Sequence, residues 1–106
     1  MAWTDAKTIG ARWVQQRLPE DLSGKRLELV SFDSDADSKF FYPGRSAEFH
    51  RMINSAIARA ARKRGARTNY VVVTPAEYLE ICEKEGVEDS PEERQAFIEA
   101  CHRIRD

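Results

Sequence analysis

Three carboxylates have the spacing that most suggests chemistry in this chain. Asp33, Asp35 and Asp37 stand at alternate positions directly after a predicted strand, and carboxylate oxygens are the ligands that hard cations prefer. A calcium loop of the EF-hand type also needs Gly at its sixth position and Glu at its twelfth, where this chain has Ser38 and Gly44. The same composition is typical of a solvated turn, because Asp and Ser side chains bond to the local backbone.

A strand that ends in Asp-x-Asp resembles the opening of the haloacid-dehalogenase-type phosphatases. The resemblance covers a few residues and implies that Asp33 is a nucleophile and Asp35 a general acid. No later pair of acids is placed to complete a magnesium site. A small metal-dependent hydrolase or phosphatase built on Asp33, Asp35 and Asp37 is therefore one hypothesis, set against a structural turn.

A basic helix is the second candidate. Arg51, Arg59 and Arg62 fall within about 80° of one another on a helical wheel, away from an apolar stripe, and Arg67 extends the row. Guanidinium groups bind phosphates and carboxylates through paired hydrogen bonds. We expect this face either to pair with the acidic part of the chain or to bind an acidic partner. Nucleic acid is an alternative, although no aromatic residue interleaves with the arginines and no helix-turn-helix or zinc-finger signature accompanies them.

The segment Phe40-Phe41-Tyr42 is the third candidate. If it is a strand, its side chains point to both faces of a sheet. The aromatic side chains on one face are then exposed to solvent unless another element packs on them. The first helix, a partner or a second copy of the chain can cover this face. We therefore place Phe40 and Tyr42 beside the arginines as candidate partner contacts.

The thiols and imidazoles show no metal-site pattern. No pair among them has zinc-ligand spacing such as C-x₂-C. Cys82 and Cys101 are predicted on core faces, where a free cysteine acts as a small hydrophobe, and His50 is predicted beside the apolar stripe. Neither these two cysteines nor His50 and His102 are assigned a catalytic role, and no cofactor is expected.

Charge is segregated along the chain. The net charge is −1, yet residues 45–67 carry seven cations and one acid, and residues 76–106 carry ten acids and four cations. The two parts either neutralise each other or present patches to partners. We see no secretory signal and no apolar run of bilayer length, so we expect reduced thiols, a cytoplasmic location and no membrane partner.

Periodicity and capping signals predict the elements that position these residues. Helices are expected over about residues 5–18, 46–64, 75–85 and from 91 onward. Strands are expected over residues 25–32 and 70–73, with a short third strand over 39–42 in a hairpin with the first. The β-branched content of 70–73 favours a central strand. The last helix is expected to bury Phe97, Ala100, Cys101 and Ile104.

We therefore predict that residues 1–106 form a single α/β (α+β) domain. We expect a two- or three-stranded sheet packed with about four helices, in the order α-β-(β)-α-β-α-α, ending in a helical hairpin. The favoured function is a non-enzymatic protein-binding or adaptor domain whose partner is an acidic protein surface or a second copy in a homodimer. A nucleic-acid-associated regulator and the metal-dependent hydrolase are the alternatives.

Overall fold

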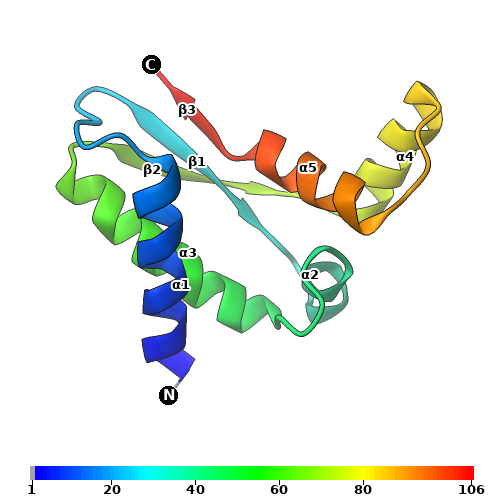
Figure 1. Ribbon diagram of the computed structural model, residues 1–106, viewed down its shortest axis with the longest axis horizontal. Coiled ribbons are helices and arrows are strands. Elements are labelled where there is room, and N and C mark those ends of the chain that lie inside the picture. Colours follow the sequence, from blue (N-terminus) through cyan, green and yellow to red (C-terminus); the bar gives the residue numbers. More distant parts are fainter. Residues whose placement is uncertain (1) are drawn as a thin grey trace.

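The computed structural model describes residues 2–106, in which five helices pack around a three-stranded sheet (Figure 1). The α+β class and the expected order of the main elements are confirmed. None of the helices in these residues is long and apolar enough to cross a membrane. The elements are α1 (Ala2–Arg17), β1 (Arg26–Ser31), α2 (Asp35–Phe41), α3 (Ala47–Lys63), β2 (Arg67–Val72), α4 (Pro75–Glu85), α5 (Pro91–Cys101) and β3 (Arg103–Arg105).

The sheet has the order β2-β1-β3, with β2 parallel and β3 antiparallel to β1. The prediction of a central strand at 70–73 is therefore wrong, because β2 is an edge strand and Tyr70 and Val72 are 47% and 46% exposed. β-Branched and aromatic residues fit any half-buried pleated surface. The residues at 70–73 therefore predicted a strand correctly, but they did not determine its position in the sheet.

The segment around residues 35–41 is a helix rather than the predicted loop and strand. Ser34 begins α2, because its hydroxyl accepts a hydrogen bond from the amide of Asp37 at 3.1 Å. With seven residues, α2 is too short to display a helical period. The third strand is instead β3, which the sequence had suggested was the end of the last helix.

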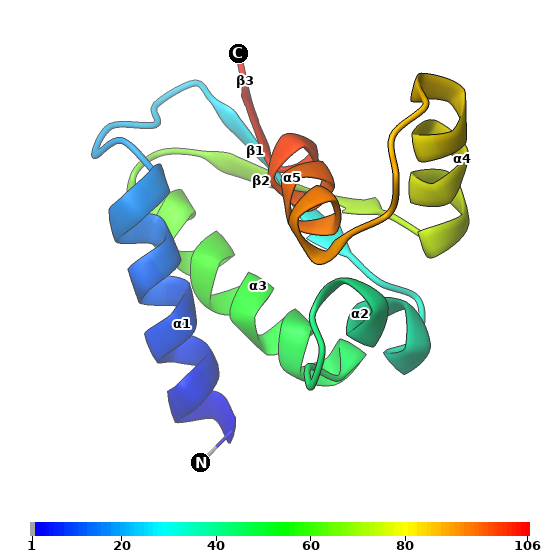
Figure 2. The same ribbon diagram turned by 45° about the vertical axis from the view of Figure 1, so that its right-hand side comes forward.

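The side chains of β1 alternate between two apolar cores. Leu27 and Leu29 face α1 and α3, while Val30 faces the core formed with α2, α4 and α5. Figure 2 shows α1 and α3 side by side at one end of the molecule, and α4 at the other. Ile98 is the fully buried residue of α5, whereas the predicted core residue Ile104 is 43% exposed on β3.

The close approach of α1 and α3 depends on Gly10. A Cβ at this position would lie 2.9 Å from the Cβ of Ala56 and 3.3 Å from the carbonyl oxygen of Ile53. We expect Gly10→Ala to lower the free energy of unfolding by about 1 kcal/mol, because overpacking outweighs the gain in helix propensity. Urea unfolding measures the change. The double variant Gly10→Ala/Ala56→Gly should recover stability, and a double variant as unstable as Gly10→Ala would contradict this packing.

Candidate functional site

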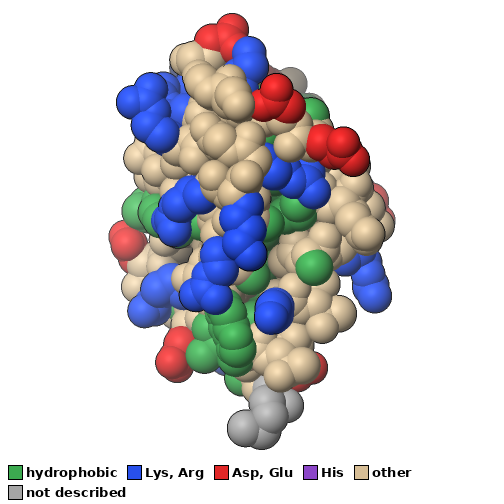
Figure 3. Space-filling view, turned by 90° about the vertical axis from the view of Figure 1, so that its left-hand side faces the viewer, with side chains coloured by type: hydrophobic (Ala, Val, Ile, Leu, Met, Phe, Trp, Pro, Cys, Tyr) green, Lys and Arg blue, Asp and Glu red, His purple; other side chains and the backbone are tan. Residues whose placement is uncertain are grey.

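The three arginines of α3 lie on its solvent-exposed side. Arg51, Arg59 and Arg62 are exposed, because the opposite side of α3 is buried against the sheet and α1 through its apolar residues and His50 and Asn54. Lys63 of α3 and Lys7 of α1 are also exposed. We call Lys7, Arg51, Arg59, Arg62 and Lys63 the basic surface, and Figure 3 shows Lys and Arg side chains gathered on this side of the molecule around hydrophobic atoms.

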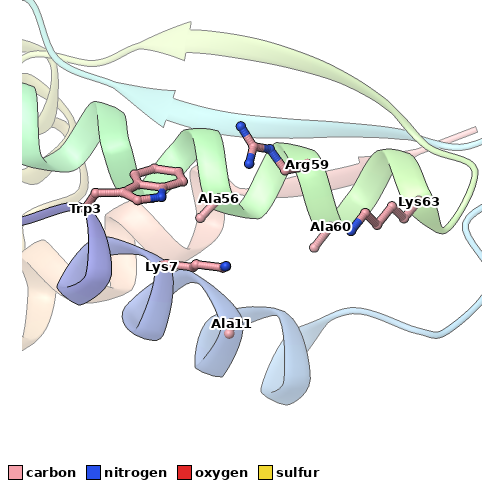
Figure 4. Close-up of a pocket in the computed structure, with 7 residues that line it drawn as sticks. All are labelled: Trp3, Lys7, Ala11, Ala56, Arg59, Ala60 and Lys63. Carbon is pink, nitrogen blue, oxygen red and sulfur yellow. The ribbon is translucent and has the colours of Figure 1, made fainter.

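A groove of about 160 Å³ runs between α1 and α3 within the basic surface. Its floor is apolar, formed by Ala11, Ala56 and Ala60 together with the indole of Trp3. In Figure 4 the two α3 alanines project towards α1, and the amines of Lys7 and Lys63 extend over the space between the helices. An apolar floor with a cationic rim suits a ligand that combines an apolar group with negative charge.

Trp3 is the residue of this site that the sequence analysis missed. Its side chain is 37% exposed, and the guanidinium of Arg59 lies 5.6 Å from the centroid of its ring. Trp3, Lys7 and Ala11 follow one another at intervals of four, which places them along one face of α1. That spacing was visible, but only the docking of α1 on α3 brings Trp3 to the arginines.

The acidic helices do not neutralise the basic surface. Figures 1 and 2 place α4 at the end of the molecule opposite α1. None of the ion pairs found among residues 2–106 includes a residue of the basic surface; they are Arg17–Glu99, Lys25–Asp106, Arg94–Asp89 and Arg105–Glu28. The acidic helix α4 therefore lies away from the basic surface, whereas α5 contacts α1 through the Glu99–Arg17 ion pair.

Arg67 does not join the other three arginines. In the register of the sheet Thr68 stands beside Leu27, on the face that α3 covers, and its hydroxyl accepts a hydrogen bond from Arg62 at 3.3 Å. Because strand side chains alternate between faces, Arg67 lies on the opposite face, beside Arg26.

Phe40 and Tyr42 are half-buried and make their contacts within the chain. The ring of Phe40 lies 5.9 Å from that of Tyr78, and the guanidinium of Arg94 covers it at 3.7 Å. Tyr42 stacks on His50, with ring centroids 5.4 Å apart. Neither aromatic ring lines the groove between α1 and α3.

The three aspartates do not form a cation site. Within residues 2–106, no three His, Cys, Asp or Glu side chains are close enough together to hold a metal ion. The carboxylate of Asp35 instead accepts a hydrogen bond from the amide of Ala47 at 2.9 Å, which ties α2 to the start of α3. Asp37 lies in the first turn of α2, where negative charge stabilises a helix.

His50 is buried, not beside the apolar stripe as predicted. Only 3% of its surface is exposed, and its Nε2 lies 2.8 Å from the carbonyl oxygen of Val30. Burial lowers the pKa of His50 to about 4, with Arg45 adding to this effect and the hydrogen bond to Val30 opposing it. The imidazole is therefore neutral at neutral pH and forms part of the core.

No family model, no curated protein and no solved structure matches this chain.

Proposed function

We propose that this protein is a non-enzymatic binding domain whose basic surface docks an acidic protein segment. The observation that supports this proposal is the groove between α1 and α3, which combines an apolar floor with Lys7, Arg59 and Lys63 at its rim. A volume near 150 Å³ is enough for a group the size of benzene. The partner therefore inserts one apolar side chain into the groove and places flanking carboxylates on the cations.

The electrostatics favour an external partner over internal pairing. Like charges on neighbouring turns of a helix repel each other, at a cost of about 0.2–0.5 kcal/mol per pair. Arg59 and Lys63 are such neighbours, and neither has an ion-pair partner among the described residues. A bound carboxylate removes this repulsion and adds charge-assisted hydrogen bonds.

A second copy of the chain has the chemistry of such a partner. Leu79 and Ile81 of α4 are 43% and 41% exposed among glutamates. Because α4 lies at the end opposite α1, contact between α4 and the groove requires two molecules (Figure 1). Sedimentation velocity at increasing protein concentration tests this arrangement, and self-association should weaken as salt is added.

Single-stranded nucleic acid is the second candidate, and Trp3 is the observation that favours it. An exposed indole among cations provides a stacking platform for a base, while the cations pair with phosphates. Binding measurements separate nucleic acid from a protein partner, because both ligands are anionic and both have apolar groups.

The test is the affinity of labelled ligands for variants of the basic surface. We expect Arg59→Glu to weaken binding of a labelled acidic peptide with one central Leu by at least about tenfold, equal to about 1.4 kcal/mol. Arg12→Glu is the matched control, because Arg12 is exposed on α1, does not line the groove and gives the same change in net charge. Fluorescence anisotropy at low and near-physiological salt measures both.

The outcomes separate the candidates. Tight binding of labelled single-stranded DNA with no binding of the peptide would show that the partner is nucleic acid rather than protein. Equal loss in Arg12→Glu and Arg59→Glu shows a non-specific charge effect and rejects the groove as the site. If neither ligand binds at low salt and the protein does not self-associate, the proposed function is wrong.

A further inference from the structure

A second hollow lies on the other side of α1, between α1, α3, α5 and the end of α2. Its volume is about 170 Å³. Apolar side chains from α1 and α3 form part of its wall, and polar groups from four separate parts of the chain converge on it. The polar groups that carry the argument are Arg17, Tyr42, Arg45, His50, Asn54 and His102.

Arg45 carries a half-buried charge in this pocket without a counter-ion. Its guanidinium lies 4.0 Å from the centroid of the Tyr42 ring, and Nη1 is 3.2 Å from Nδ1 of His50. No carboxylate among the described residues forms an ion pair with it. Arg17, the other arginine of the pocket, is already paired with Glu99 through contacts of 2.9 and 3.1 Å. The pocket therefore has an uncompensated positive charge.

Buried polar side chains of α3 hold Arg45 in place. The Val30 carbonyl can only accept hydrogen bonds, so Nε2 of His50 donates to it and Nδ1 is left to accept from Arg45. Asn54 donates to the same carbonyl at 2.7 Å. His50 and Asn54 are 3% and 2% exposed. The arginine is thus positioned by a network anchored in the sheet.

His102 adds a polar atom that has no partner. Its Nδ1 is buried and makes no hydrogen bond within residues 2–106. Its ring lies 5.3 Å from the ring of Trp13, which also lines the pocket. Buried polar atoms in native proteins are nearly always bonded to protein, water or ligand. No described residue supplies that bond to Nδ1.

We propose that this pocket, which Arg45 and His102 help to line, binds a small organic anion whose carboxylate or phosphate group pairs with Arg45. The body of the ligand packs against Trp13 and the apolar wall. A cavity of about 150 Å³ holds a benzene-sized group, so the ligand is of that size. This inference does not depend on the basic surface, which lies in a different part of α1 and α3.

The two tryptophans of the chain report the two sites separately. Trp13 lines this pocket and Trp3 lines the groove of the basic surface. We would titrate the protein with benzoate and, in a second series, with inorganic phosphate, against chloride at matched ionic strength. Two-dimensional NMR of the indole N–H signals should show a saturable shift at Trp13, which is distinct from any shift at Trp3 caused by binding in the groove. The series that saturates at the lower concentration identifies the anionic group.

Arg45→Gln tests the residue that carries the charge. We expect it to weaken binding at least tenfold, whereas Arg12→Gln leaves binding unchanged, because Arg12 is exposed on α1 and lines neither this pocket nor the groove. Arg45→Lys and a circular dichroism spectrum show whether a loss of binding reflects charge or folding. A shift confined to Trp3, equal binding by wild type and a folded Arg45→Gln, or no saturable binding of either probe would overturn the proposal.

Discussion

Ile98→Ala should lower the free energy of unfolding by about 3 kcal/mol, whereas Ile104→Ala should cost less than about 1 kcal/mol. Ile98 has no exposed surface, and Ile104 is 43% exposed. The two substitutions remove the same atoms, and the residues are six positions apart. The expected difference therefore comes mainly from burial.

Ile98 has this effect because α5 attaches to the sheet through it. It belongs to the core that contains Val30, Phe41 and Tyr78, so its removal leaves a cavity between α2, α4, α5 and β1. A cavity adds to the lost transfer free energy because the surrounding side chains relax only partly. Ile104 lies on β3, beside Leu27 of β1, at a surface that water reaches.

Urea denaturation of the two variants and the wild type measures these changes, provided that the slope of the transition stays constant. A larger loss for Ile104→Ala than for Ile98→Ala would mean that the last helix continues to residue 104 and buries the face expected from the sequence. Circular dichroism at low urea checks that both variants start from the folded state.

The second large effect is a loss of stability in acid that arises from His50. Burial lowers its pKa from 6.5 to about 4. Between pH 6.5 and 4, His50 therefore binds a proton in the unfolded chain but not in the folded protein. The free energy of unfolding consequently falls as the pH decreases from about 6.5 towards 4. Each unit of pKa difference is worth about 1.4 kcal/mol, so the full loss is about 3 kcal/mol.

His50→Gln should flatten this dependence. Glutamine retains an N–H donor for the carbonyl of Val30 but takes up no proton in this range. His102, whose pKa burial also lowers, contributes in the same direction in both proteins, so the difference between their stability curves isolates His50. His102→Gln is the control, because it leaves the contribution of His50 in place.

Urea unfolding at several pH values between 4 and 7 gives the two curves, and NMR titration of the imidazole C–H signals gives the pKa of each histidine directly. A His50 signal that titrates near 6.5 in the folded protein would show that the ring is accessible to water. In that case the pH dependence of wild type and His50→Gln should also coincide.

Local sequence signals determined much of the secondary structure. Thr74 and Ser90 each cap a helix with a hydroxyl that accepts an amide hydrogen bond three residues later, at 3.2 and 3.1 Å. Ser46 does the same for α3, and Gly86, with a φ of 69°, ends α4. Such features act within one or two turns of chain, so they can be read without knowledge of the fold.

Only the tertiary structure decided which residues share a surface. The arginine spacing on α3 was evident from the sequence, but the position of Trp3 depends on how closely α1 approaches α3, and the face of Arg67 depends on strand register. The pocket around Arg45 joins residues from α1, α3, α5 and the segment after α2. Packing and register are long-range properties, which is why the sequence predicted the four longer helices of this protein but not its sites.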